Sequence, residues 1–146
     1  MTIIAPPFER ALAFILEWEG GYSNDPKDPG GETRWGISKR SYPEINIATL
    51  TKEQAAAIYR RDYWDRCKCG DLPLGLGLAV FNAAVNQGPK SALKLLKATE
   101  GQSDLLLDFF ARQLVRYGQT VNFEIYGRGW ARRSLACYRT ALQLGD

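Results

Sequence analysis

Glu19 is the first residue whose type and position could do chemistry. Apolar residues precede it at helical spacing, at Phe8, Ala11, Leu12 and Ile15, and Glu19 falls in the middle of the stripe that they form. A carboxyl group on an apolar stripe loses hydration when it ionises, and the C-terminal end of a helix also disfavours an anion. A carboxylic acid that keeps its proton is what general-acid cleavage of a glycosidic bond requires. The alternative is an acid that simply reaches solvent where a short helix ends.

The loop after Glu19 carries two further carboxyl groups, Asp25 and Asp28. They follow Glu19 by six and nine residues, on a chain that glycines can reverse. A second carboxylate across from a general acid can steer a water or stabilise positive charge at a sugar carbon. Asp-Pro steps are also ordinary turn formers, so both interpretations stay open. Thr33 could hold a water beside these acids, or it could be an ordinary strand residue.

The composition excludes several other chemistries. The chain has 146 residues and no histidine, which excludes serine and cysteine triads built on imidazole and HExxH zinc sites. Three cysteines without a fourth ligand make a poor zinc site, so we expect no metal and no cofactor. The odd count and the close spacing of Cys67 and Cys69 favour reduced thiols, and a bridge from either one to Cys137 stays open.

Helical spacing that alternates with Gly/Pro punctuation predicts a mainly α protein. We expect helices over about 7–19, from Thr51 to 64 or 66, and over 72–87, 89–97, 103–117 and 129–144. Residues 72–87 are almost wholly apolar, which predicts the central helix of the core. Between the first two helices, residues 22–38 contain two Asp-Pro steps and a Gly-Gly pair, so a loop or a small β-hairpin is expected there.

Length and hydropathy favour one domain over residues 1–146, with two lobes that share a core and a helical C-terminal part from about 90 onward. No run approaches the ~20 apolar residues of a membrane span. The N-terminus lacks the positive and apolar segments of a secretory signal, so we expect synthesis without a signal peptide.

The net charge is +3, and the basic residues gather near the C-terminus. From residue 124 to 146 there are two acids and four arginines, namely Arg128, Arg132, Arg133 and Arg139. This pattern is typical of a solvated helix face. It would also suit a surface attracted to an acidic polymer, either cell wall or nucleic acid.

Residues 19–38 read E-G-G-Y-S-N-D-P-K-D-P-G-G-E-T-R-W-G-I-S. This segment resembles the signature of glycoside hydrolase family 108, the lysozyme-like N-acetylmuramidases of phage endolysins and bacterial secretion loci. The resemblance continues in order through residues 57–64, 72–73, 79–89 and 127–133. It implies a lysozyme-like helical fold with a small loop or β-hairpin lobe after the first helix. It also implies cleavage of the β-1,4 bond between N-acetylmuramic acid and N-acetylglucosamine.

The family's catalytic acid is the glutamate of E-G-G-Y, which matches Glu19. The order of Glu, Asp nine residues on and then Thr is similar to that of phage-type lysozymes. This similarity implies that Asp28 and Thr33 are the partners of Glu19, with Asp25 as the runner-up for the second carboxylate.

The sequence departs from the family pattern at two places. Asn82 stands where the F-D-A-A-V-N block has an Asp, and we expect that position to be structural. A segment of the form D-G-x-x-G-P-x-T, which resembles a wall-binding element, is missing after residues 98–103. Affinity for the polymer is therefore expected to be weaker or to lie elsewhere.

Aromatic residues flank the matching blocks, at Tyr22, Trp35, Tyr63 and Trp64. Because the apolar faces of sugars pack on aromatic rings, these residues are candidates for substrate binding, with core packing as the alternative. Trp130 is assigned to packing. Asn86 and Gln87 end a buried helix and could hydrogen-bond an N-acetyl group, or could cap that helix.

Three functions remain: a hydrolytic muramidase with Glu19 as general acid, a lytic transglycosylase on the same bond, and a non-enzymatic wall- or nucleic-acid-binding module. For the first we expect peptidoglycan glycan strands as the partner, a monomer, and neither nucleic acid binding nor membrane insertion. Synthesis in the bacterial cytoplasm and action in the periplasm or wall would require a holin or a secretion system. Inversion or retention, wall preference, and phage or bacterial origin stay open.

Overall fold

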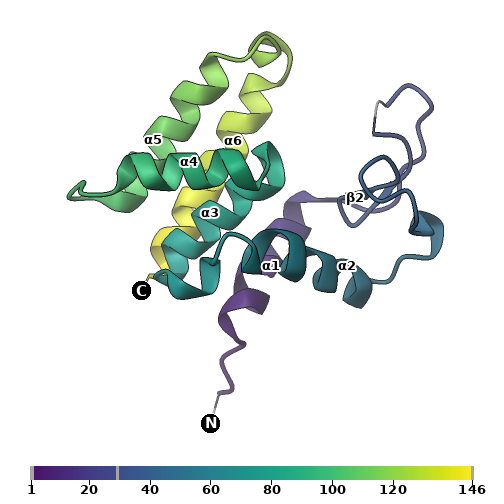
Figure 1. The fold of residues 1–146 in the computed structure, drawn as a ribbon, viewed down its shortest axis with the longest axis horizontal. Helices are drawn as coiled ribbons and strands as arrows, with labels where there is room; N and C mark the ends of the chain where they lie inside the picture. The colour runs from purple at the N-terminus through teal and green to yellow at the C-terminus, as the bar shows by residue number, and fades with distance from the viewer. Residues whose placement is uncertain (1, 29, 146) are drawn as a thin grey trace.

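The computed structural model describes residues 2–28 and 30–145, and over these the chain forms six α-helices and one small sheet (Figure 1). The mainly α prediction is confirmed. The elements follow the order α1 (Pro7–Trp18), β1 (Thr33–Arg34), β2 (Ile37–Ser38), α2 (Lys52–Tyr59), α3 (Leu74–Gln87), α4 (Pro89–Thr99), α5 (Leu105–Gly118) and α6 (Phe123–Leu144). None of the helices in this part of the chain is long and apolar enough to cross a membrane.

Helix α1 carries the predicted apolar stripe toward the core. Pro7 starts the helix, at a position where its missing N–H costs nothing. Phe8, Leu12 and Ile15 are buried. The helix ends at Trp18, one residue earlier than predicted, and Glu19 follows as an extended cap. The side chain of Glu19 therefore leaves the helix where the chain turns toward the β-hairpin.

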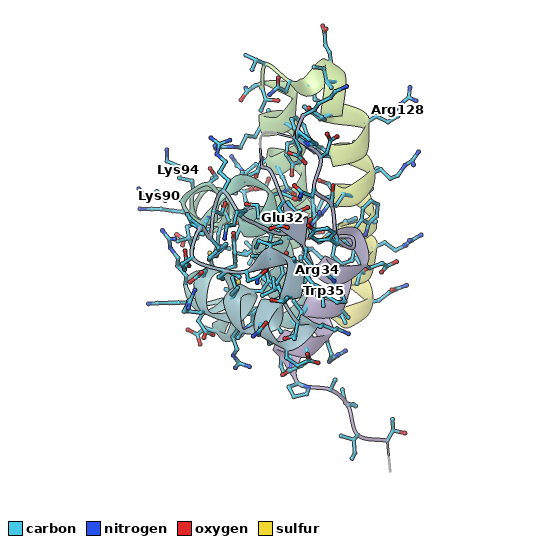
Figure 2. The ribbon with its side chains drawn as sticks, turned by 90° about the vertical axis from the view of Figure 1, so that its right-hand side faces the viewer. Glu32, Arg34, Trp35, Lys90, Lys94 and Arg128 are labelled. Carbon is cyan, nitrogen blue, oxygen red and sulfur yellow. The ribbon has the colours of Figure 1, made fainter. Side chains whose placement is uncertain are left out.

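Helix α3 is the central helix, as its composition predicts. Every residue from 74 to 84 is buried. Gly75 and Gly77 let neighbouring backbone approach closely: an added Cβ would lie 2.5 Å from the carbonyl oxygen of Ala141 and 2.8 Å from that of Cys69, respectively. Charged side chains project outward from the helices around it, as Lys90, Lys94 and Arg128 do in Figure 2.

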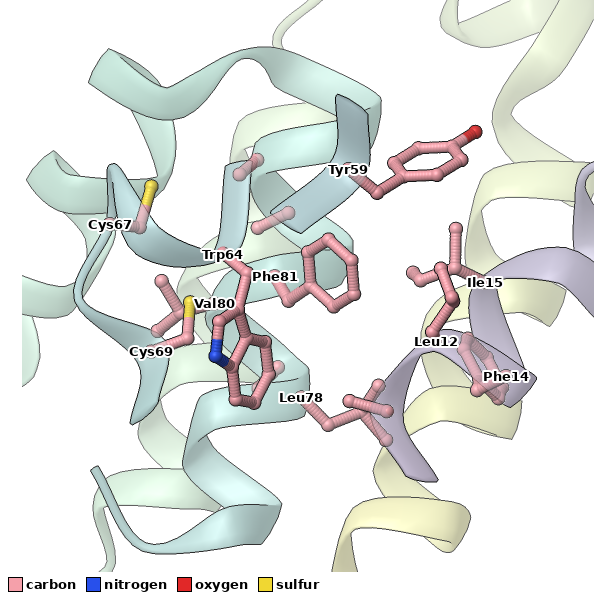
Figure 3. Packing of buried hydrophobic residues seen from close by; sticks show 14 of the residues in the cluster. Leu12, Phe14, Ile15, Tyr59, Trp64, Cys67, Cys69, Leu78, Val80 and Phe81 are labelled. Atoms are coloured by element: carbon pink, nitrogen blue, oxygen red, sulfur yellow. The ribbon is translucent and has the colours of Figure 1, made fainter. Parts of the chain in front are cut away.

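The second helix differs from its prediction. A capping box of Thr51 and Gln54 starts α2, as the sequence suggests. The α-helix ends at Tyr59, however, and residues Arg60–Asp65 continue it as a π-helix. The wider turn changes which side chains face inward. Trp64 is buried against Phe8 and Phe81, whose ring centroids lie 5.7 and 5.4 Å from that of Trp64. Figure 3 shows Trp64 beside Phe81.

Helices α5 and α6 form a hairpin that rises on one side of α3, and the β1–β2 lobe lies on the other side of α1 (Figure 1). Asp104, and not Ser103, caps α5 by accepting a hydrogen bond from the Leu107 N–H at 3.0 Å. Helix α6 begins at Phe123, six residues before the predicted start. The two strands pair antiparallel, as a hairpin requires, with Thr33 opposite Ser38. All three cysteines are buried and unbridged.

Candidate active site

Glu19 forms an ion pair with Arg133, which lies in the middle of α6. Arg133 Nη1 donates to Glu19 Oε1 at 2.7 Å, and the two side chains are 11% and 24% exposed. The Glu19 carboxylate is therefore neither buried among apolar groups alone nor free in solvent. A cation that lies against it is a feature that the apolar stripe of α1 does not predict.

Asn82 of α3 orients the guanidinium of Arg133 through a hydrogen bond. The guanidinium Nε donates to Asn82 Oδ1 at 2.9 Å, and Asn82 is fully buried. Helices α1, α3 and α6 are thus linked through Glu19, Arg133 and Asn82. Because Asn82 is neutral, it orients the guanidinium without neutralising it. The positive charge is left for the carboxylate of Glu19.

The turn of the β-hairpin closes over the stem of Glu19. Gly36 has φ +76°, and a Cβ built on it would lie 2.8 Å from the Glu19 Cβ and would collide with the Tyr59 hydroxyl. Tyr59 donates to the carbonyl oxygen of Trp35 at 2.8 Å, which fastens the turn to α2. Burial raises the pKa of Tyr59, and the negative charge of Glu19 raises it further, so this hydroxyl stays a donor.

Trp35 forms part of the turn of the β-hairpin, and its indole N–H has a hydrogen-bond partner. It has φ +54°, an uncommon conformation for a residue other than glycine, and its indole Nε1 donates to the Leu50 carbonyl oxygen at 3.2 Å. Its ring is half-buried. The indole N–H is therefore already used, and the exposed part of the ring is what remains for a ligand.

Tyr22 lies in a second charged cluster, at the mouth of the hairpin. Its hydroxyl donates to Glu32, and the guanidinium of Arg34 lies 4.8 Å from its ring centroid. The hydrogen bond to Glu32 is the main cause of a raised Tyr22 pKa. Figure 2 shows Glu32, Arg34 and Trp35 close together on this face. Glu32 is a third carboxylate of the loop, which the spacing argument passed over.

Asp25 and Asp28 stabilise the loop between α1 and β1. Asp25 Oδ1 accepts from the Lys27 N–H, and Asp28 Oδ1 accepts from the Gly30 N–H, both at 2.9 Å. Among the described residues, no hydrogen bond or ion pair joins either aspartate to Glu19. Both carboxyl groups are exposed. The turn-forming interpretation of the two Asp-Pro steps therefore applies, and a catalytic one stays a prediction.

Thr33 lies in β1, where its backbone pairs with Ser38 and forms a bridge with Ser23. The backbone N–H of Thr33 donates to the Ser23 carbonyl oxygen at 2.8 Å, and the reverse bond is 2.9 Å. These two bonds tie the end of the acidic loop to the hairpin. The two bonds hold the two ends of the loop, at Ser23 and Thr33, next to each other.

The two aromatic candidates after α2 differ in their surroundings. Tyr63 is half-buried, with its ring centroid 5.7 Å from that of Tyr59, and burial raises its pKa. Trp64 is only 3% exposed and packs in the core. The expectation that Trp64 contacts substrate is therefore corrected, because its indole offers a sugar no surface.

Asn86 and Gln87 end α3 on the side of the α5–α6 hairpin. Asn86 is exposed, and its amide lies beside the hydroxyl of Tyr117, which lowers the Tyr117 pKa against the larger effect of burial. The hydrogen bond to that hydroxyl comes from Gln113 Nε2, at 3.4 Å. Gln87 has a buried Oε1 with no partner among the described residues. Asn86 lies one turn beyond Asn82, so α3 presents two amides toward α6.

Two hollows of the surface lie away from Glu19. One of about 440 Å³ is lined by residues that include Leu76, Leu105 and Leu142, and one of about 410 Å³ lies between α4 and α5. Over residues 2–28 and 30–145, no group of three or more Asp, Glu or Cys side chains is placed to hold a metal ion.

Comparison with known proteins gives a family match and a structural match. The family model described as Glycosyl hydrolase 108 matches residues 12–88, which include Glu19 and Asn82 but not Arg133. The structure of Brucella abortus SagA is similar with a TM-score of 0.83 and 27% sequence identity, over 94% of each chain. No curated protein sequence matches. With more than half of its length matched by the family model, this chain belongs to the glycosyl hydrolase 108 family.

Proposed function

We propose that this glycosidase hydrolyses peptidoglycan, at the β-1,4 bond between N-acetylmuramic acid and N-acetylglucosamine, with Glu19 as the general acid. The observation that carries the proposal is the placement of Glu19. Its carboxylate is partly exposed at the junction of α1, α6 and the β-hairpin, within the segment that the family model matches. A general acid needs a fixed position and access to the glycosidic oxygen, and this placement supplies both.

Arg133 has a defined part in this reaction. As the general acid, Glu19 must carry a proton when the bond is cleaved, so its reacting form differs from the anion of the ion pair described above. When Glu19 gives that proton to the departing sugar oxygen, it becomes the anion again. The guanidinium 2.7 Å away balances that charge, and Asn82 fixes its direction. Preorganised charge beside a developing anion needs no rearrangement at the moment of bond cleavage.

For the second carboxylate we propose Asp28, with Thr33 as its neighbour in holding a water, and Asp25 as the alternative. The distance between the acting carboxyl groups would decide the stereochemistry, with ~5–5.5 Å for retention and ~6.5–9.5 Å for inversion. We propose Tyr22, Trp35, Tyr63, Asn86 and Gln87 as substrate-binding residues. Trp64 is left out because it is buried.

A lytic transglycosylase is the second candidate, and one observation favours it. Asp25 and Asp28 are both engaged in turns of the loop and neither touches Glu19. A transglycosylase needs one carboxyl group that serves first as acid and then as base, so it could work without them. The product would be an anhydro sugar.

The C-terminal arginines offer less support for a binding module without catalysis. Arg128, Arg132 and Arg139 lie near one another on an exposed face of α6, whereas Arg133 faces the opposite way, toward Glu19. We interpret the three exposed arginines as a solvated helix face. We propose that the protein acts as a monomer in the periplasm or wall, after release through a holin or a secretion system.

The test is digestion of purified peptidoglycan followed by mass spectrometry of the released fragments. Hydrolysis adds one water for each bond cleaved, and we expect fragments with reducing N-acetylmuramic acid ends. Anhydro ends would favour the transglycosylase. Release of fragments cut in the peptide stems alone, or of no fragments, would contradict a glycosidase acting on this polymer.

A further inference from the structure

We propose that Tyr126, Trp130 and Asn86 form an outer glycan subsite, which binds an N-acetylated sugar on the α5–α6 side of Glu19. The inference rests on the proposed function. It adds a binding surface on α6, beyond the end of the segment that the family model matches.

The aromatic residues continue the face of α6 that carries Arg133. At about 100° per residue, Tyr126 and Trp130 fall within about 60° of Arg133 around the helix. With a rise of about 1.5 Å per residue, they lie about 10 and 4.5 Å from it along the helix axis. A ligand that reaches Glu19 from this side therefore passes over both rings.

This face of α6 is covered near Arg133 and uncovered near Tyr126. Further along the helix, Ser134, Cys137 and Ala141 on the same face are buried. Tyr126 is 54% exposed, although it lies in the same apolar stripe. This face of α6 thus extends beyond the helices that cover it, and the ring of Tyr126 at its N-terminal end is exposed to solvent.

Trp130 and Tyr126 pack in turn on the buried ring of Tyr117, which holds them in place. Tyr117 of α5 is buried, and Trp130 stacks on it with the ring centroids 5.0 Å apart and the planes 22° from parallel. Tyr126 follows at 5.7 Å from Trp130, tilted by 35°. A platform of this kind loses little conformational freedom when a ligand packs on it.

Asn86 supplies a polar group beside the rings. Its amide lies beside the Tyr117 hydroxyl, whose pKa it lowers, while the residue itself is exposed. An amide has both donor and acceptor atoms, so this side chain can pair with the acetamido group of a sugar. Since Asn82 and Asn86 are one turn apart on α3, the first amide supports the Glu19 ion pair and the second lies beside the platform.

The chemistry of the patch fits a neutral, N-acetylated sugar. Its rings match the apolar face of a pyranose, and Asn86 matches its amide. The charged residues Arg128 and Arg132 point from the other side of α6, and Figure 2 shows Arg128 extending away from the body of the protein. Neither Arg128 nor Arg132 therefore contributes charge to the patch.

The experiment measures glycan binding by variants in the Glu19→Gln background, which removes cleavage. Binding of N-acetylglucosamine oligomers is followed by tryptophan fluorescence, and binding to purified peptidoglycan by sedimentation. We expect Tyr126→Ala to weaken both by roughly 2- to 12-fold, the loss of one aromatic contact, and Tyr126→Phe to retain affinity. Leu135→Ala is the matched control, because Leu135 is 59% exposed on the opposite face of α6.

In the active protein, Tyr126→Ala should raise KM for peptidoglycan and leave kcat at saturation unchanged, with Asn86→Ala acting in the same direction. A purely structural role would instead lower the melting temperature and the active fraction. If the parent cleaves peptidoglycan while Tyr126→Ala and Asn86→Ala keep full affinity, the subsite is overturned and the proposed function stands. If the parent neither cleaves nor binds glycan, the proposed function fails, and the subsite fails with it.

Discussion

Replacement of Arg133 by methionine tests the ion pair that holds the candidate acid. Methionine keeps much of the arginine stem but leaves Glu19 without its cation and Asn82 without its donor. Breaking a buried pair costs about 3–5 kcal/mol, but Glu19 is 24% exposed and water can replace part of the loss, so about 2 kcal/mol is reasonable here. A buried acceptor left unpaired adds about 1 kcal/mol.

Arg133→Met is therefore expected to lower the free energy of unfolding by about 3 kcal/mol in total. For a chain of this size, that loss corresponds to a fall of roughly 10 °C in melting temperature. Urea unfolding followed by circular dichroism measures it. Arg132→Met is the matched control, since Arg132 is exposed, and it should stay within about 0.5 kcal/mol of the parent. A double-mutant cycle with Glu19→Gln should show that the two losses are not additive. Equal stability of Arg133→Met and Arg132→Met would refute the reasoning.

Three other substitutions test separate features. Gly36→Ala should destabilise the protein by more than about 1 kcal/mol in urea unfolding, because φ is +76° there and a Cβ would press on Glu19; a neutral result would contradict the close approach. Gly129→Ala should stabilise α6 by about 0.5–1 kcal/mol, since the added Cβ meets nothing within 4 Å. Hydrogen bonds from Arg61 and Tyr42 lower the Asp62 pKa, so its contribution to stability is present above the unfolded value near 3.9 and is lost as pH falls through the folded pKa. Asp62→Asn should therefore flatten the loss of stability as pH falls below about 4, and an unchanged slope there would count against it.

The sequence predicts well what is set by local spacing. The apolar stripe of α1, the buried α3 and the glycine turn after Glu19 all depend on neighbours a few residues apart. The family signature lies in the same region. These features suffice to place Glu19 at the end of α1, facing the core side of the helix.

The partners of Glu19 could not be found in this way. Arg133 lies 114 residues further along the chain, and from the sequence it is one of four arginines in a basic stretch. Only the packing of α6 on α1 and α3 selects it. Asn82 departs from the family pattern, and in the structure it accepts a hydrogen bond from that arginine.

Trp64 and Trp130 show what helical periodicity leaves out. Helical spacing predicts a continuous α-helix through residue 64, but the π-helical turn from Arg60 rotates Trp64 into the core. Trp130 does pack, on Tyr117, as expected. Its other role, as part of a partly exposed platform, follows from where α6 extends past its neighbours, which periodicity does not report.

The rate of peptidoglycan clearance by Glu19→Gln, measured beside Glu17→Gln, tests the central claim most directly. Both residues lie at the end of α1, but Glu17 is exposed and faces away from Arg133. We predict that Glu19→Gln keeps the fold by circular dichroism and loses at least ~10²-fold in rate, while Glu17→Gln clears the wall like the parent. Clearance by folded Glu19→Gln at the parental rate would contradict the assignment of Glu19 as the general acid.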